Sequence, residues 1–267
     1  MIKVLTYNIH KGFDVYNRNF VLHKIRQQLE SIDVDMVFLQ EIHGQHLGNE
    51  TNVSGWPEGS QFEFLADQIW PHYAYGKNAI YNNGHHGNAI LSKYRFEEWH
   101  NINLSRFSRA SRSFLHGTVR LPKSDSRLHL ICVHFELIGF ERIRQLNILK
   151  KYIERSIPDT DPIILAGDFN DWSGSTGVRI ESQLRMKEVF RASHGSVAKT
   201  FPSRWPLLGM DRIYFRGLKL LECERLKGAP WQSMSDHLPL YAKLHSFPLT
   251  DLGEIDPGQN SCTQKGF

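Results

Sequence analysis

Cysteine is scarce in this chain of 267 residues, and long apolar runs are absent. The three cysteines, Cys132, Cys223 and Cys262, lie far apart, and such an odd, scattered set matches neither a disulfide framework nor a zinc motif. No apolar stretch is long enough to cross a membrane, and the first residues resemble a strand rather than a basic region followed by a signal segment. We therefore expect a cytoplasmic location.

A strong charge of either sign is also missing. With 32 Lys and Arg against 28 Asp and Glu, the formal net charge is +4, which suits an anionic substrate but is equally typical of an ordinary surface. Hydrophobic residues make up 40% of the chain and aromatic residues 12%, which is enough for a large core. Composition therefore predicts a globular domain and leaves its function to particular residues.

Apolar periodicity predicts more strands than helices. Residues Leu22–Ile32 and Glu141–Ile157 carry apolar side chains at helical spacing, and each segment leads through a turn into a short buried strand, Met36–Leu39 or Ile163–Ala166. Further strands are predicted at Asn88–Leu91, Gly117–Leu121, Leu128–His134, Asp211–Phe215 and Leu238–Leu244. Because the helices fall between strand pairs, we expect an α/β (α+β) fold of two sheets covered outside by helices.

The remaining segments are predicted to be loops or tail. Gly44–Ser60 and Tyr81–Gly87 are polar and contain glycine, which is typical of loops. From residue 246 onward the chain loses all periodicity. We predict one domain over residues 1–245 and a C-terminal tail over residues 246–267.

Chemically useful side chains stand where several apolar runs end. These strand-end residues are Asn8, Glu41, Asp168, Asn170, Asp236 and His237. Several strands that deliver amide, carboxylate and imidazole groups to one rim are typical of a hydrolytic site that uses a divalent metal. The pattern therefore predicts such a site.

Each carboxylate also has a plainer interpretation. Glu41 follows a buried strand, where a hard cation such as Mg²⁺ would offset the cost of its charge, but an exposed strand end or an Arg partner would serve as well. Asp168 and Asn170 stand two apart and point to one side of an extended chain, where they could orient or deprotonate water. An Asx turn after the strand is the alternative.

The segment Ser235-Asp236-His237 places an acid directly beside an imidazole. Adjacent residues on a strand point to opposite faces, so we expect the partner of His237 to come from elsewhere, with Asp211 the best candidate. An Asp–His pair raises the basicity of the imidazole and fixes its tautomer, and Asp236 is then free to reach a metal. A salt-bridged surface loop is the alternative.

Other polar residues give weaker signals. His134 ends a predicted strand and could equally be a satisfied structural histidine. His85 and His86 are adjacent in a glycine-containing loop, which is a poor geometry for chelating one metal ion. A basic and aromatic cluster in a predicted loop, consisting of Arg106, Phe107, Arg109, Arg112 and Phe114, could meet phosphate or a nucleobase, or could simply be solvated.

Taken in order, several motifs together resemble the endonuclease/exonuclease/phosphatase superfamily, which shares its fold with DNase I-like nucleases. The matching segments are Thr6–Ile9, Leu39–Glu41, Gly87–Ser92, Val133-His134, Gly167–Asn170, Asp211–Ile213 and Ser235–His237. The likeness is strongest to a bacterial branch that has a Tyr-Asn-Ile-His-Lys-Gly opening and a Gly-His-His-Gly-Asn-Ala loop, as in Tyr7–Gly12 and Gly84–Ala89.

This resemblance implies a four-layer α/β/β/α sandwich, in which two packed mixed sheets are flanked by helices and the site lies at one end. It implies that Glu41 binds Mg²⁺, or alternatively Mn²⁺, with Asn8 and Asp236 assisting. Asp168 would activate water, and Asn170 would contact the phosphate. His237, oriented by Asp211, would contact the phosphate or act as a base, and His134 would serve the leaving oxygen. Arg109, Arg112 and Asn88 are predicted to contact substrate.

The implied reaction is hydrolysis of a phosphoester by water, and three functions compete. The first is a Mg²⁺-dependent phosphodiesterase acting on nucleic acid, DNA or RNA. The second acts on a phospholipid or a small phosphate ester, in which case Trp172, Phe201 and Trp205 could face lipid. The third is a binding module without turnover. Gln40-Glu41-Ile42 departs from the Gln-Glu-Thr usual in abasic-site nucleases, and no obligate protein partner is evident.

Overall fold

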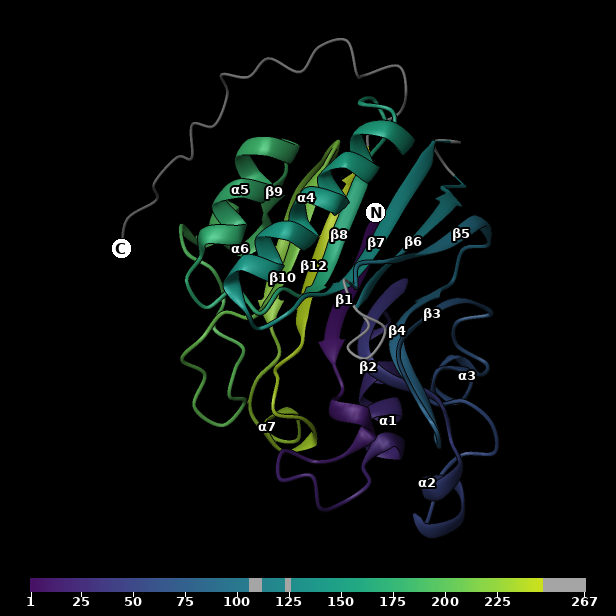
Figure 1. The fold of residues 1–267 in the computed structure, drawn as a ribbon. Helices are drawn as coiled ribbons and strands as arrows, with labels where there is room; N and C mark the ends of the chain where they lie inside the picture. Colours follow the sequence, from purple (N-terminus) through teal and green to yellow (C-terminus); the bar gives the residue numbers. More distant parts are fainter. Residues whose placement is uncertain (106–111, 123–125, 247–267) are drawn as a thin grey trace.

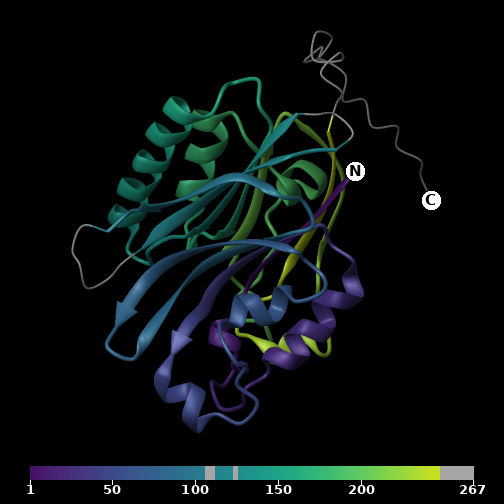
Figure 2. The ribbon, with the colours of Figure 1, turned by 90° about the vertical axis from the view of Figure 1, so that its right-hand side faces the viewer.

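The computed structural model describes residues 1–105, 112–122 and 126–246. Over these residues two six-stranded sheets pack face to face. Helices α4 and α5 lie on the outer face of one sheet, and α1 and α3 lie on the outer face of the other (Figures 1 and 2). This arrangement confirms the predicted four-layer α/β/β/α sandwich.

The first sheet has the strand order β11-β12-β1-β2-β4-β3. Strands β1 and β2 are parallel and the other neighbours are antiparallel, so the sheet is mixed. Its strands are β1 (Ile2–Asn8), β2 (Met36–His46), β3 (His72–Tyr81), β4 (Gly84–Ser92), β11 (Leu218–Arg225) and β12 (Leu240–Ser246).

The second sheet has the strand order β5-β6-β7-β8-β10-β9. Only the β7 and β8 pair is parallel. Its strands are β5 (Phe96–Asn103), β6 (Ser113–Arg120), β7 (Arg127–His134), β8 (Ile163–Asp168), β9 (Lys187–Glu188) and β10 (Asp211–Arg216). In both sheets, therefore, a parallel pair lies at the centre, and its strands end on the same side.

The helices are amphipathic and lie on the sheets through their apolar faces. Helix α1 (Leu22–Ile32) buries its apolar side chains against β1 and β2, and α4 (Gly139–Ser156) does the same against β7 and β8. The shorter helices are η1 (His10–Gly12), α2 (Leu47–Asn52), α3 (Gln61–Ala66), α5 (Ser175–Leu184), α6 (Val189–His194) and α7 (Trp231–Met234). No helix of the described residues is both long and apolar enough to span a membrane.

Strand alternation divides the apolar side chains between the layers. Val4 and Phe38 of the first sheet face Leu130 and Ile164 of the second, and together they form the core between the sheets. The residues next to them along each strand point outward to the helices. Strands buried on both faces are therefore almost continuously apolar, which is why a polar residue at their ends is conspicuous.

Two predicted loops contain regular secondary structure. Within Tyr81–Gly87, β3 ends at Tyr81 and β4 begins at Gly84, so the segment is a tight hairpin; within Gly44–Ser60, β2 runs on to His46 and is followed by α2. Polar residues favoured a loop in the prediction, but His85 and His86 lie on β4, whose backbone is paired with β2 and β3. A Cβ on Gly87 would lie 1.9 Å from the carbonyl oxygen of Gly76, so this glycine permits close strand packing and does not mark a loop.

Other differences are smaller. Phe114, predicted to lie in a loop, is a buried residue of β6, and Arg112 stands just before that strand. Arg106, Phe107, Arg109 and Cys262 lie outside the described residues, as does the predicted tail beyond Ser246. Helix α4 begins two residues before the predicted Glu141, and strands β3, β5 and β11 had not been predicted. The carboxyl ends of β1, β2, β7 and β8 and the amino ends of β10 and β12 form one end of the sandwich (Figure 1).

Candidate active site

Strand register brings three of the predicted residues into one row. His134 on β7 pairs with Asp168 on β8, and Asp168 pairs with Asp211 on β10. From the other sheet, Asn8 at the end of β1 donates a hydrogen bond from Nδ2 to Oδ2 of Asp168 over 3.2 Å. The polar ends of both sheets therefore meet, as the strand-end pattern predicts.

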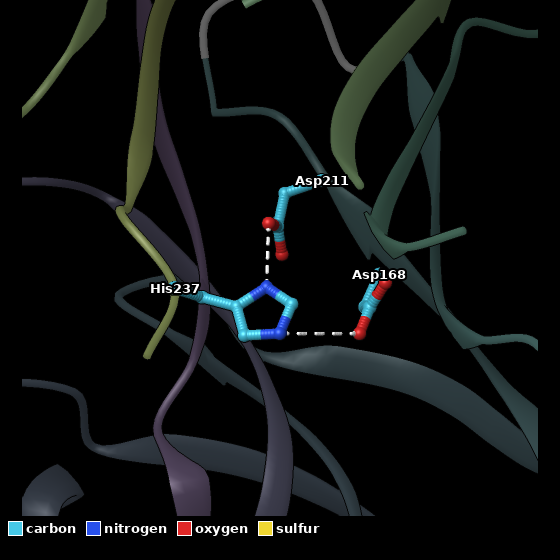
Figure 3. Close-up of side chains that lie close together, drawn as sticks. All are labelled: Asp168, Asp211 and His237. Atoms are coloured by element: carbon cyan, nitrogen blue, oxygen red, sulfur yellow. Dashed lines mark hydrogen bonds and ion pairs between the residues drawn. The ribbon is translucent and has the colours of Figure 1, made fainter. Parts of the chain in front are cut away.

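His237 lies between two carboxylates, as Figure 3 shows. Its Nδ1 is 2.8 Å from Oδ2 of Asp211, and its Nε2 is 3.8 Å from Oδ2 of Asp168. Burial alone lowers the pKa of His237, but the carboxylates of Asp211 and Asp168 outweigh burial and raise the pKa to about 10. The imidazole is consequently protonated at neutral pH, and both of its N–H groups face acceptors. The expected Asp211–His237 pair is present, although His237 precedes β12 and is not on a strand.

Asp168 is fully buried at the end of β8. Burial, together with the nearby negative charge of Asp211, raises its pKa to about 6, although the His237 charge opposes this. Its Oδ1 accepts a hydrogen bond from the backbone N–H of Asn170 over 2.9 Å, so the Asx-type turn foreseen as the plainer interpretation is present. Asn170 has left-handed backbone, with φ of 49°, and its Nδ2 donates to the carbonyl of Phe135.

His134 is buried next to a cation. Nη1 of Arg112 lies 3.2 Å from its Nδ1, and Oδ2 of Asp168 lies 3.5 Å from its Nε2. Burial and the positive charge of Arg112 hold the pKa of His134 well below its usual range, so the ring is neutral. Arg112 is fixed in turn by Glu136, with 3.1 Å between Nε and Oε1.

Glu41 occupies an unusual position within β2. Its φ is 56°, at a register shift in the pairing with β4 between Leu39 and Ile42. Oε2 of Glu41 is buried, lacks a hydrogen-bond partner among the described residues, and lies 3.5 Å from Nζ of Lys11. Burial acts to raise the pKa of Glu41, but the charges of Lys11 and His237 outweigh it, and the pKa is lowered. A residue that combines left-handed backbone with an ionised carboxylate and an unsatisfied oxygen is typical of a functional site.

Asp236 and Asn88 lie at the edges of this arrangement. Asp236 is half-buried, with Oδ1 3.9 Å from Nδ1 of His10, and Ser235 anchors its segment by donating to the carbonyl of Asn8 over 2.7 Å. Asn88 is buried on β4, where Nδ2 donates to the Ser113 carbonyl, while its Oδ1 has no hydrogen-bond partner in the described chain. Arg109, the remaining predicted substrate contact, falls outside the described residues.

The site fits a hard cation through its oxygen atoms. Ligand atoms of Asp168, Asp211 and His237 all lie within 4.8 Å of one another. The imidazole is a poor metal ligand here, because both of its nitrogens face carboxylates and its raised pKa keeps them protonated. Glu41 is not part of this group, but its Oε2 lacks a hydrogen-bond partner among the described residues and is an oxygen that a hard divalent cation would satisfy.

Sequence reasoning assigned no role to several residues that surround Glu41. Lys11 and His10 stand in the turn after β1 with left-handed φ values of 60° and 47°, and Nζ of Lys11 lies 3.5 Å from Oε2 of Glu41. Their segments were recognised as motifs, but only the folded chain places Lys11 and His86 beside the β2 bulge. Left-handed backbone at non-glycine residues is not readable from sequence, so no signal in a single chain identified them.

The family model described as the Endonuclease/Exonuclease/phosphatase family matches residues 5–237. A protein named YbhP from Escherichia coli (strain K12) is 40% identical over 243 residues, covering 91% of this chain and 96% of that protein. The endonuclease/exonuclease/phosphatase from Beutenbergia cavernae has a similar fold, with a TM-score of 0.74 at 18% identity, over 92% of this chain and 71% of that one.

A further solved structure with this fold is D. rerio TDP2 complexed with single strand DNA product. Its TM-score is 0.68 at 16% identity, and the likeness covers 92% of this chain and 99% of that chain. The match to the family model spans most of the chain, including all of the described site residues from Asn8 to His237. This chain belongs to the Endonuclease/Exonuclease/phosphatase family.

Proposed function

We propose that the protein is a Mg²⁺-dependent phosphodiesterase. The observation that carries the proposal is His237 held between the carboxylates of Asp211 and Asp168, at a site where Oε2 of Glu41 has no hydrogen-bond partner among the described residues. The imidazolium of His237 and two carboxylates at one buried site suit a reaction in which water attacks the phosphorus of an anionic phosphodiester. Members of this family generally depend on a divalent metal.

The pKa values assign complementary tasks to the two sides of the site. Asp168 is ionised at neutral pH yet more basic than an ordinary carboxylate, so it accepts the proton of the attacking water. Protonated His237 contacts the phosphate as a hydrogen-bond donor, which favours this one of its two expected roles over that of a base. The water oxygen bonds to phosphorus, the phosphorus–oxygen bond to the leaving alcohol breaks, and that oxygen takes a proton from solvent.

His134, Asn170 and the metal support this step. Because the His134 ring is neutral, its N–H gives the leaving oxygen a hydrogen bond rather than a full proton. Nδ2 of Asn170 donates one hydrogen to the Phe135 carbonyl and has a second for contact with the phosphate. Mg²⁺, with Mn²⁺ as the alternative, would be held by Glu41 with Asn8 and Asp236 assisting, and it would supply charge stabilisation to the phosphoryl oxygens.

Nucleic acid is the first substrate to test. The mildly basic chain and the fold shared with a TDP2 that was solved with a single-strand DNA product support it. A phospholipid is the second candidate, favoured by a specific observation: Trp172 and Trp205, singled out as lipid-facing candidates, are strongly exposed, whereas Phe201 is half-buried with its ring centre 5.0 Å from that of His237.

The test uses a small, water-soluble diester, bis(p-nitrophenyl) phosphate, and supercoiled plasmid, each with Mg²⁺ and with EDTA. We expect the wild type to hydrolyse the small diester with Mg²⁺ only, and His237→Ala to lose this activity. Plasmid nicking with the same dependence would assign nucleic acid. Equal hydrolysis of the diester by wild type and His237→Ala would overturn the proposed chemistry.

A further inference from the structure

Large apolar side chains are exposed at the end of the sandwich where β1, β2, β7 and β8 finish, called here the catalytic end. Three connections and the first turn of α4 carry them: the connection after β7, which leads into α4, the one after β8 and the one before β10. Their exposed fractions lie between 55% and 75%, although single domains normally bury side chains of this kind. They are Leu137, Ile138, Phe140, Trp172, Trp205 and Leu207.

These connections adjoin the catalytic residues directly. The first follows His134, the second contains Asn170, and the third contains Phe201, whose ring packs on His237. Because β7 and β8 end where β10 begins, all three project from one end of the second sheet. Figure 1 shows the connection before β10 beside α7, at the end where β1 finishes.

The apolar side chains are held outward by ordered backbone. The carbonyl of Leu137 accepts a hydrogen bond from the buried guanidinium of Arg142, which fixes the start of α4. In the connection before β10, Phe201 and Leu208 form an isolated bridge, and the N–H of Ser203 donates to the carbonyl of Asp236 over 2.7 Å. The exposure is therefore built into structured turns, which favours an interaction surface.

Positive charge accompanies the apolar groups. The exposed ring of Tyr16, in the connection after β1, lies 5.0 Å from the guanidinium carbon of Arg204 and 5.8 Å from that of Arg18. Arg204 is the neighbour of Trp205. Aromatic rings with a polar edge next to arginines are typical of side chains at the boundary between lipid headgroups and hydrocarbon.

A bilayer fits this surface better than a nucleic acid. Bases would stack on Tyr16, Trp172 or Trp205, but the aliphatic side chains of Leu137, Ile138 and Leu207 gain nothing from a sugar–phosphate backbone. The same side chains gain free energy on entering the outer hydrocarbon of a membrane, while Arg18 and Arg204 complement anionic headgroups. Both kinds of side chain then contribute to one contact.

We propose that the catalytic end docks on an anionic phospholipid bilayer, which favours the phospholipid over nucleic acid among the two candidate substrates. This choice of substrate rests on the proposed function, whereas docking does not. The apolar side chains would enter the interface, with Arg18 and Arg204 at the headgroups and His237 facing the lipid phosphates.

Docking is tested by co-sedimentation of the full chain with vesicles of phosphatidylcholine alone or mixed with phosphatidylglycerol. We expect clear binding to the anionic vesicles, and at least about tenfold weaker binding for the double variant Phe140→Ala, Trp205→Ala. Trp99→Ala and Leu221→Ala are matched controls, because both side chains are exposed on strands away from the catalytic end, and we expect wild-type binding. Arg18→Gln with Arg204→Gln should reduce the preference for anionic vesicles.

Hydrolysis of bis(p-nitrophenyl) phosphate by every variant serves as the independent check of folding and of the proposed function. Vesicle binding with no diester hydrolysis would refute the function and leave docking supported. Docking is overturned if wild type stays in the supernatant with anionic vesicles, or if the double variant binds as wild type does. It is also overturned if the double variant loses plasmid binding while wild type ignores vesicles, since the surface would then serve nucleic acid.

Discussion

Nδ1 of His237 lies 2.8 Å from Oδ2 of Asp211, although 26 residues separate them in the chain. Asp211 opens β10 and pairs with Asp168 at the end of β8, so the same register that aligns the two carboxylates also determines where the imidazole fits. The Thr200 hydroxyl accepts the backbone N–H of Asp211 over 3.2 Å and anchors the strand start. The charge and the orientation of His237 thus both depend on Asp211.

Replacing Asp211 with Asn keeps the shape of the side chain but removes its charge. Because that charge raises the pKa of His237, we expect the pKa to fall and kcat on the small diester to drop about a hundredfold or more. Turnover and an NMR titration of the His237 ring measure the two effects. Asp161→Asn is the control, because Asp161 lies 3.2 Å from His129 in an Asp–His pair away from the catalytic end. Unchanged turnover in Asp211→Asn would contradict the assigned role.

The raised pKa of His237 predicts a pH dependence of stability. The folded pKa of about 10 exceeds the ordinary 6.5, so the folded state binds the proton more tightly than the unfolded state. The resulting stabilisation is complete below pH 6.5 and is lost as the pH rises through about 10. Urea unfolding at a series of pH values should therefore show falling stability over this window, and His237→Asn should flatten the slope. A slope that His237→Asn leaves intact would count against the pairing.

Asp168 shows the opposite relation between charge and stability. Its pKa is raised from 3.8 to about 6, so folding favours the neutral form and stability falls as the pH rises between these values. At pH 8 the uncharged Asp168→Asn should be more stable than wild type by about 1–3 kcal/mol, and should lose diester hydrolysis. Denaturant unfolding in EDTA measures the first effect. If Asp168→Asn were less stable than wild type at pH 8, the charged Asp168 would not destabilise the folded protein, and the prediction would be wrong.

The sequence indicated much of this site because its polar residues stand at the ends of apolar runs. Asp168 follows Ile163–Ala166 and is indeed buried at the end of β8, and the Asp211–His237 pair was predicted from the fact that Asp236 is a poor partner. The two sheets were predictable for the same reason, since strands such as β1 and β8 are apolar on both faces.

What the sequence did not reveal depends on contacts between distant segments. Gly87 was assigned to a loop because its segment is polar and contains glycine, yet its real constraint is the close approach of Gly76 on β3. Lys11 carries no local signal, and only the bulge in β2 brings Glu41 to its ammonium group. The roles of His134 and His237 diverge through burial and neighbouring charges, which sequence spacing does not specify.

Glu41 is expected to be the main protein ligand of the metal. Glu41→Gln should weaken Mg²⁺ binding at least about tenfold, because it removes the ionised carboxylate whose Oε2 is unsatisfied in the described structure. Isothermal titration calorimetry measures the affinity. Glu154→Gln, an exposed change on α4, is the control and should bind Mg²⁺ as wild type does. Equal affinity in all three proteins would place the ion elsewhere.

Gly167 positions Asp168 by allowing β8 to approach β7. A Cβ at Gly167 would lie 2.0 Å from the carbonyl oxygen of Val133, and its φ of 145° disfavours any other residue. We expect Gly167→Ala to destabilise the protein by roughly 2–4 kcal/mol and to reduce diester hydrolysis, since the strand must shift where it delivers Asp168.

Gly174→Ala is the matched control for this change. Gly174 also has positive φ, 75°, but its Cβ would meet no atom within 4 Å, so the expected loss is only about 1 kcal/mol, with activity retained. Thermal unfolding and turnover on the small diester, measured side by side, separate the two glycines. If both variants lost stability and activity equally, positive φ alone would explain the effect, and the contact between β7 and β8 would not be what holds Asp168 in place.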